Sequence, residues 1–330
     1  MENQILKNIS IEDIEKLQAI KALLGEGQIA TNAVSMKQFA EEYSAFVKSN
    51  LSMAYWVSVE LALKHLLKFF SGATALNVIK IREVEKFIDY LKKNAPQGYR
   101  VYYRTLKAAF NKAIDWGYAS ENPFCKYKLP KKQRNRPDFI TEAELGLILQ
   151  RLESKAFKIG CSKAKRKSLL MIYDIVKTGF YSGMRLGELL NLRWENVSLS
   201  KNTITVGDHR FVTKGKKQRT IPMCEKLSKC IKQRAQSKGQ SVEYVFGVSA
   251  KRTLTKDYVS KTFKEICRAA GIDERIKFHS LRHSFASYLA QQGVSPYHIK
   301  ELLGHASVTT TEIYSHLNED VLKQAIEKFN

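Results

Sequence analysis

The chain has 330 residues, and its 55 lysines and arginines outnumber 32 aspartates and glutamates, which gives a formal net charge of +23 at pH 7. So large a positive charge predicts a polyanionic partner, above all nucleic acid. With 44% hydrophobic residues and no run of about 18 apolar residues, the composition excludes both a disordered basic tail and a membrane-spanning protein.

Residues 1–34 are expected to form an N-terminal extension. Isoleucines and leucines recur between Ile5 and Leu23 and predict a short helix there. The start of the chain lacks the charged and then apolar order of a signal peptide, so we expect a cytoplasmic protein associated with the nucleoid. The length of the remaining chain predicts two domains.

Residues 35–120 are predicted to form a helical domain. Apolar residues recur there at steps of three and four in four successive stretches, which is the period of helices with one buried face. The stretches begin near Phe39, Leu61, Val84 and Leu106. The last helix carries a group of cations that we expect to contact DNA: Arg100, Arg104 and Lys107.

Residues 121–139 are interpreted as a linker, because prolines interrupt them and neither a helical nor a strand period continues. Their cations suit a strap along a phosphate backbone. The residues expected to make these contacts are Lys131, Lys132, Arg134 and Arg136. The alternative is a solvated connector, since charge runs are common in connectors.

The second predicted domain covers residues 140–330. Thr141 and Glu144 have the spacing of a capping box that opens a helix. Further helices are expected at about 165–182, 185–192, 225–238, 256–270, 279–292, 296–303 and 308–316. Short β-rich runs are expected at 203–206, 210–213 and 219–222, and they predict a small antiparallel sheet. The predicted fold class is mainly α, with a four-helix domain followed by an α+β domain.

Cations, imidazoles and a tyrosine in this domain have the character of a phosphodiester site. Cleavage of a phosphodiester needs a nucleophile, positive charge on the non-bridging oxygens and a proton for the departing alkoxide. His279 and Arg282 are three residues apart, so on a helix they share one face. Arg185 follows a Ser-Gly-Met turn, and His305 precedes Tyr314 near the C-terminus. The set predicts cleavage of a DNA strand by a covalent tyrosine.

Each residue also has a simpler interpretation. Arg185 alone is typical of a surface cation, and Tyr314 alone of a packing aromatic. His279 and His283 are four residues apart, as zinc ligands can be, but no glutamate base stands between them and no third ligand is evident. Five cysteines without a C-x-x-C pair indicate neither a disulfide framework nor a zinc knuckle. No Gly-rich nucleotide loop occurs, so we expect neither a metal nor a cofactor.

From about residue 140 onward the chain resembles the tyrosine recombinases, the family of phage integrases and Xer-type enzymes. The resemblance rests on Ser-Gly-Met-Arg-Leu-Gly-Glu-Leu, Thr-Lys-Gly-Lys-Lys-Gln-Arg, His-Ser-Leu-Arg-His, Leu-Gly-His-Ala-Ser and Thr-Glu-Ile-Tyr-Ser-His, in the family's order. The matching residues are Arg185, Lys214, His279, Arg282, His305 and Tyr314. Residues 35–120 resemble the family's core-binding domain more loosely, while the extension 1–34 and the basic segment 158–167 lie outside the shared pattern.

The resemblance implies a clamp around duplex DNA in which Tyr314 forms a 3′-phosphotyrosine. Arg185 and Arg282 would bind the non-bridging oxygens with help from His305, and His279 would assist proton transfer at the tyrosine. Lys214 would protonate the 5′-oxygen, although Lys216 and Lys217 are alternatives. Because these groups supply positive charge and the phosphotyrosine conserves the bond energy, neither metal nor ATP is needed.

The resemblance also implies a homo-oligomer, a dimer on one DNA site and a tetramer when two sites pair. Residues 318–330 carry an amphipathic pattern and are expected to form a helix that packs into a neighbouring protomer. Accessory DNA-bending proteins are possible partners. Two alternatives remain: a type IB topoisomerase-like enzyme that nicks and closes DNA, and a DNA-binding regulator with this fold but no turnover.

Overall fold

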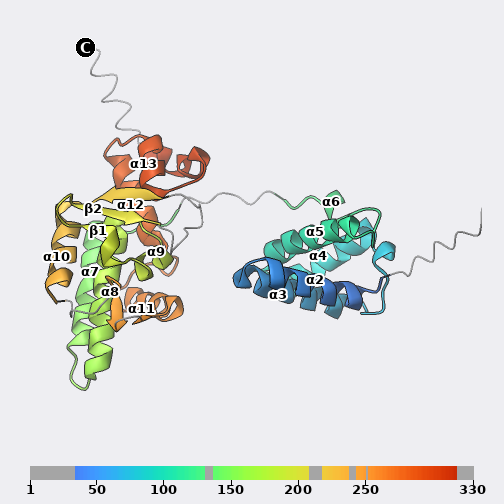
Figure 1. The fold of residues 1–330 in the computed structure, drawn as a ribbon, viewed down its shortest axis with the longest axis horizontal. Helices are drawn as coiled ribbons and strands as arrows, with labels where there is room; N and C mark the ends of the chain where they lie inside the picture. The colour runs from blue at the N-terminus through green and yellow to red at the C-terminus, as the bar shows by residue number, and fades with distance from the viewer. Residues whose placement is uncertain (1–33, 131–136, 208–217, 238–242, 250–251, 318–330) are drawn as a thin grey trace, which may run out of the picture. The chain divides into compact units, whose positions relative to one another are not determined.

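The computed structural model describes residues 34–130, 137–207, 218–237, 243–249 and 252–317. The chain divides into two compact units, one up to residue 133 and one from residue 134 onward, each with its own core. Figure 1 shows both units as mainly helical, which confirms the predicted fold class. Over the described ranges, no helix is both long enough and apolar enough to cross a membrane.

The first unit contains the four predicted helices. Their bounds are α2 Met36–Asn50, α3 Met53–Phe69, α4 Ile81–Asn94 and α5 Tyr99–Asp115, with short turns η2 Leu76–Val78 and α6 Pro123–Lys126. Ser35 and Ser52 cap α2 and α3, since each side chain accepts a hydrogen bond from a free backbone N–H of the first turn. Each of the four helices buries one face, as the spacing of the apolar residues predicts.

The second unit holds a larger core around a pair of adjacent helices, α7 Glu142–Ala156 and α8 Lys163–Ser182. The predicted capping box is present: Thr141 and Glu144 satisfy each other's backbone N–H groups. The other helices are α9 Leu186–Leu190, α10 Glu225–Ser237, α11 Lys256–Ala269, α12 Ser280–Gln291 and α13 Pro296–Leu303. Among these, α12 packs on α8 and α13 lies against strand β3.

The predicted antiparallel sheet is also present. Strands β1 Val197–Ser198, β2 Thr203–Val206 and β3 Arg219–Pro222 pair in that order, with Val206 opposite Arg219. The predicted run 210–213 lies outside the described residues. A hairpin of β4 Gly247–Ser249 and β5 Arg252–Thr253, which the sequence did not predict, forms a second small sheet.

The helix expected at 308–316 is wrong in type. The chain forms two 3-10 turns there instead, η4 Val308–Thr310 and η5 Glu312–Leu317. An earlier 3-10 turn, η3, covers Trp194–Asn196. Val308 begins a run of four β-branched residues that ends at Thr311, and such residues disfavour an α-helix because they lose rotamer freedom against the preceding turn. Turn η5 packs against α12.

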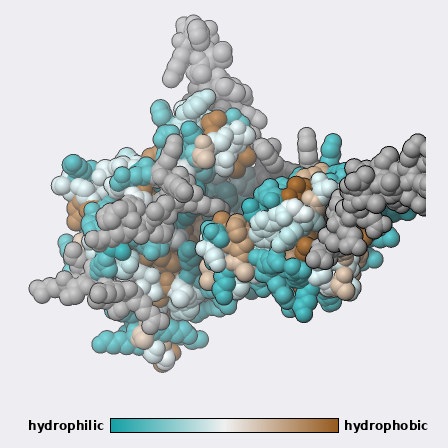
Figure 2. Space-filling view, turned by 45° about the vertical axis from the view of Figure 1, so that its right-hand side comes forward, coloured by the Kyte–Doolittle hydropathy of each residue, from teal (hydrophilic) through white to brown (hydrophobic). Residues whose placement is uncertain are grey.

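The described surface is largely hydrophilic. Figure 2 shows hydrophilic residues over much of the visible face, with smaller hydrophobic groups between them. Most large apolar side chains of the described residues are buried, and two of the exposed ones, Phe157 and Ile159, flank Lys158 of the basic segment in sequence.

Candidate active site

Arg185 is positioned by the turn between α8 and α9. Helix α8 ends at Gly183, whose φ of 64° is in the left-handed region. A Cβ at this position would lie 2.5 Å from the Phe285 ring, so a glycine is required. Arg185 then caps α9, and its backbone N–H and Nη1 donate to the Glu188 carboxylate at 2.9 and 2.8 Å. The guanidinium is thus held through Nη1, while the Arg185 side chain remains 30% exposed.

Glu188 is a buried carboxylate between two arginines. Arg219, the first residue of β3, donates to it from Nη1 at 3.2 Å and from Nη2 at 2.6 Å, and Nη1 of Arg185 donates to the same carboxylate. Burial by itself raises the pKa of Glu188, but the bonds from Arg219 and Arg185 more than offset it, so the pKa is lowered. Glu188 therefore fixes the positions of both guanidinium groups.

Arg282 on α12 is the most deeply buried cation of the site, with 2% exposure. Its Nη1 donates to the carbonyl oxygen of Gly183 at 2.9 Å, and its Nη2 donates to that of Leu303 at 2.6 Å. These carbonyls end helices α8 and α13, where the helix dipole favours a positive charge. Burial and then Arg185 lower the pKa of Arg282 to about 9, which leaves it charged at pH 7.

The carbonyl bonds use two of the five N–H groups of the Arg282 guanidinium. Among the residues that the structure describes, no carboxylate bonds to Arg282. Arg185, Arg219 and Arg282 together face one carboxylate, Glu188, so their group carries an excess of positive charge. A buried cation without an anionic partner is costly, and a bound anion would relieve that cost.

Two histidines border this group. His279 lies at the N-terminus of α12, and His305 follows Gly304, the left-handed residue that ends α13. Burial and then the charges of Arg282 and Arg185 lower the pKa of both rings, that of His305 to about 4. The His305 ring is therefore neutral at pH 7. Its Nδ1 lies 2.9 Å from the Thr311 hydroxyl, and this contact holds the ring in place.

Tyr314 lies on η5 with 2% exposure, packed against apolar residues of α12 and α13. Its hydroxyl is 2.5 Å from His283 Nδ1. The His283 ring in turn meets the His279 ring edge to face, with 5.0 Å between centroids. Burial raises the pKa of Tyr314 to about 12, although the charge of Arg282 acts in the opposite direction.

Five of the six residues predicted for the chemistry thus come together at one place: Arg185, His279, Arg282, His305 and Tyr314. The sixth, Lys214, lies outside the described residues, in the connection from β2 to β3. Over the described ranges, no three His, Cys, Asp or Glu side chains are grouped as a metal site would require. The arrangement can bind a singly charged anion such as a phosphodiester and place a hydroxyl nucleophile beside it.

Comparison with known proteins decides the family. Residues 138–320 match the phage integrase family, and residues 35–129 match the phage integrase SAM-like domain. A tyrosine recombinase of Pseudothermotoga lettingae is 30% identical over 262 residues, which are 76% of this chain and 85% of the relative. The chain belongs to the tyrosine recombinases of the phage integrase family. It is thus an enzyme of DNA recombination.

Solved structures show the same fold. The Tn1549 transposon integrase in complex with a circular intermediate DNA aligns with a TM-score of 0.71 at 17% identity, over 90% of this chain and 100% of that chain. A lambda integrase tetramer bound to a Holliday junction aligns with a TM-score of 0.67 at 19% identity, over 90% of this chain and 87% of the other.

Four contacts of the recombinase site did not emerge from the sequence. Glu188 and Arg219 were not recognised, although Arg185 and Glu188 have the capping-box spacing that could have indicated their bond. Thr311 was not connected with His305. The sequence places His283 in the cluster of imidazoles and cations but gives it no role in catalysis, yet it is the residue that bonds to the Tyr314 hydroxyl.

The cations predicted to contact DNA are only partly described. On α5, Arg104 is exposed, Lys107 is half-buried, and Arg100 Nη1 donates to the carbonyl oxygen of Pro130 at 2.9 Å. That bond joins the first turn of α5 to the middle of the predicted linker. Lys131, Lys132, Arg134 and Arg136 lie outside the described residues.

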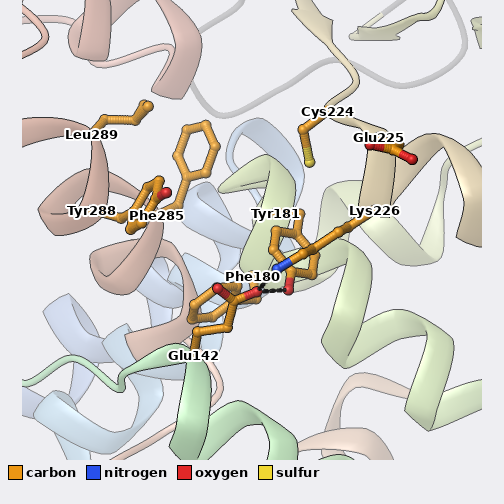
Figure 3. A pocket seen from close by; sticks show the side chains of 9 residues that line it. All are labelled: Glu142, Phe180, Tyr181, Cys224, Glu225, Lys226, Phe285, Tyr288 and Leu289. Carbon is orange, nitrogen blue, oxygen red and sulfur yellow. Dashed lines mark hydrogen bonds and ion pairs between the residues drawn. The ribbon is translucent and has the colours of Figure 1, made fainter. Parts of the chain in front are cut away.

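The second unit also contains a hollow of about 330 Å³ (Figure 3). Phe180 and Tyr181 of α8 face Phe285 and two further residues of α12 across it. Glu142 accepts hydrogen bonds from the Tyr181 hydroxyl and from a lysine of α10 at its rim. None of the five residues grouped above lines this hollow, so it is distinct from their site.

We expect Glu188→Gln to destabilise the recombinase by about 3 kcal/mol, because it removes one charge from a buried ion pair and leaves two arginines facing a neutral amide. Denaturant unfolding would measure the change.

The effect of this substitution should depend on pH. Since the pKa of Glu188 is lowered in the folded protein, the stabilisation that the ionised carboxylate provides is present above its unfolded-state pKa near 4.5. That stabilisation is lost as the pH falls from this value through the lower pKa of the folded protein. The variant should therefore differ from the native chain less at acid pH.

Glu301→Gln is the matched control, since the side chain of Glu301 is 78% exposed and pairs with the neighbouring Lys300 at the surface. It should leave the free energy of unfolding unchanged. Equal stabilities for the Glu188 and Glu301 variants at pH 7 would contradict the role assigned to the buried carboxylate.

Proposed function

We propose that the recombinase cleaves one DNA strand by in-line attack of the Tyr314 hydroxyl on a phosphodiester. The products are a 3′-phosphotyrosine and a free 5′-hydroxyl, and religation to the 5′-hydroxyl of a second DNA completes the exchange. The observation that carries the proposal is Arg282, a buried charge held by carbonyl oxygens close to a buried tyrosine. Such a site is suited to an anion that reacts with that tyrosine.

The proposed roles of the two arginines follow from their surroundings. Arg282 is fixed by two helix ends and keeps three N–H groups for non-bridging oxygens. Arg185 is more exposed and is held by Glu188, so it can approach the same phosphate from the solvent side. A planar guanidinium can bind a phosphate with two parallel hydrogen bonds. Both groups would stabilise the charge that develops in the transition state.

His305 is proposed to donate a hydrogen bond to the same phosphate. Because burial and nearby charges lower its pKa to about 4, the ring is neutral at pH 7. When Nδ1 accepts from the Thr311 hydroxyl at 2.9 Å, the ring proton stays on Nε2. Thr311 would thus select the tautomer that makes His305 a donor.

Lys214 is proposed to protonate the departing 5′-oxygen, with Lys216 and Lys217 as alternatives. All three belong to the connection between β2 and β3. The end of that connection is fixed beside the site, because Arg219 bonds to Glu188 and its Nε donates to the carbonyl oxygen of Leu302 at 2.9 Å. A lysine a few residues before Arg219 would be within reach of the phosphate.

We further propose that both units bind one duplex and that four protomers pair two DNA sites. The lambda integrase tetramer on a Holliday junction, which has this fold, supports such an assembly. The proposed substrate is chromosomal or element DNA in the cytoplasmic nucleoid, and DNA-bending proteins are candidate accessory factors. The excess of positive charge supports a large contribution of phosphate contacts to the affinity.

Deletion of residues 318–330 is expected to spare binding to a single DNA site and to abolish pairing of two sites. Their sequence predicts an amphipathic helix for a neighbouring protomer, whereas the phosphate site is built from residues before them. Gel retardation would measure single-site binding, and light scattering with two-site DNA would measure tetramers. Tetramers of the truncated chain would contradict the proposed role of this segment.

Trapping the covalent intermediate tests the proposed function. The target is first selected from a pool of random duplexes by binding to the protein. A copy nicked near the scissile phosphate then releases a short strand after cleavage, so that the adduct accumulates. We expect a denaturation-resistant protein–DNA adduct that forms equally in the presence of a chelator. DNA binding without any adduct would indicate a regulator, and relaxation of any supercoiled plasmid would indicate a topoisomerase-like enzyme.

A further inference from the structure

We propose that His283 is the general base that takes the proton of Tyr314 during cleavage. The proposal rests on the proposed function, because it concerns the activation of the same nucleophile. The resemblance to tyrosine recombinases implies that His279 assists this proton transfer, whereas the hydrogen bond in the structure joins the tyrosine to the next histidine of the motif.

The geometry favours His283. Its Nδ1 lies 2.5 Å from the Tyr314 oxygen, which is within the reach that a general base requires. The hydrogen bonds of the described residues do not join His279 to the tyrosine, and the His279 ring instead meets the His283 ring edge to face, 5.0 Å between centroids. His279 is thus placed to orient the base.

Helix α12 links the proposed base to the phosphate site. It carries His279, Arg282 and His283, so the group that binds the phosphate and the group that would deprotonate the nucleophile belong to one rigid element. Arg282 is anchored by carbonyl oxygens at the ends of two other helices. The proposed base therefore keeps a fixed position relative to the arginine that would bind the phosphate, as efficient proton transfer requires.

The protonation state of His283 is suitable for a base. The groups that face it are His279 and Arg282 from its own helix, Asp138 from the segment before α7, and Tyr314 from η5. Burial and then the first two of these lower the pKa of His283 to about 4, while Asp138 acts in the opposite direction. The ring is thus neutral at pH 7, and in the tautomer with its proton on Nε2 it accepts a bond from the phenol at Nδ1.

The proton transfer is coupled to bond formation. The pKa of Tyr314 is raised to about 12, so the free protein holds a phenol rather than a phenolate. As the Tyr314 oxygen bonds to phosphorus and the O–H bond breaks, Nδ1 takes the proton and His283 becomes an imidazolium. The bond from phosphorus to the 5′-oxygen breaks, and that oxygen takes a proton from the general acid. On religation the imidazolium returns its proton to the tyrosine.

His283→Asn tests the base, because asparagine keeps a hydrogen-bond acceptor near the position of Nδ1 but does not take up the proton. We expect single-turnover adduct formation on the nicked duplex to slow by about 10²-fold or more. His298→Asn is the matched control, since His298 is exposed on α13, and it should react at the native rate. An unchanged rate for His283→Asn would overturn the proposal.

A more acidic nucleophile at position 314 distinguishes a general-base role of His283 from a purely structural role. With 3,5-difluorotyrosine at position 314, the phenol ionises more readily and depends less on a base, so the effect of His283→Asn should shrink to less than about 10-fold. A purely structural role predicts the same loss for both nucleophiles, and that result would overturn the proposal.

One measurement needs no change at His283. In a duplex with a 5′-bridging phosphorothiolate, the leaving group is a thiolate that needs no general acid. The only proton transferred during cleavage is then the one that leaves the Tyr314 hydroxyl. A normal solvent deuterium isotope effect is then expected for the unsubstituted chain, and its absence would overturn the proposal. Absence of any adduct in the unsubstituted chain would instead refute the proposed function itself.

Discussion

Tyr314→Phe should abolish the covalent adduct, with a loss of at least about 10³-fold, while the protein still retards DNA. The substitution removes a single oxygen, and phenylalanine fits the apolar surroundings that already bury the ring. Without that oxygen the chain has lost its nucleophile, and loss of a nucleophile typically costs several orders of magnitude in rate. Denaturing gels of the nicked duplex would measure the adduct, and native gels would measure binding.

Tyr297→Phe is the control for this experiment, because Tyr297 is 67% exposed on α13. It should form the adduct at the native rate. An adduct formed by Tyr314→Phe in native yield would contradict the assignment of the nucleophile, since the remaining chain would then contain another one.

Arg282→Lys should slow cleavage by about 10²–10³-fold, the usual cost of removing a donor that stabilises charge in a transition state. Lysine keeps the charge but has one compact ammonium, so it does not bond to Gly183 and Leu303 and also hold two phosphate oxygens. Binding of DNA should change much less, because many other phosphate contacts remain.

The folded state of this variant has to be checked separately, since Arg282 also links the ends of two helices. The unfolding midpoint of Arg282→Lys would show whether the domain is intact at the temperature of the assay. Arg275→Lys, at a position 73% exposed, should leave both the midpoint and the cleavage rate unchanged. A native cleavage rate for a folded Arg282→Lys protein would contradict the proposed role.

The sequence predicted much of the fold because local patterns determine it. The period of apolar residues predicted the helices, and the Thr141 capping box marked the start of α7 correctly. The helix predicted at 308–316 is wrong in type, because that prediction rested on the apolar period alone and ignored the β-branched residues that begin at Val308. The β4–β5 hairpin was missed because its strands are too short to show an alternating pattern.

The composition of the site could be predicted from chemistry, but its internal contacts could not. Glu188 and Arg219 are 31 residues apart in sequence, as are His283 and Tyr314, and no local period connects such pairs. They meet because α12 packs against η5 and because the Arg219 side chain of β3 reaches Glu188 of α9. The roles of the predicted residues stay predictions, and the contacts show which substitutions would test them.

Mass spectrometry of the trapped adduct tests the central claim most directly. After nuclease and protease digestion, we predict a residual nucleotide mass on the peptide that contains Tyr314, joined through its phenolic oxygen to a 3′-phosphate. A nucleotide on any other residue, or an adduct joined through a 5′-phosphate, would contradict the account.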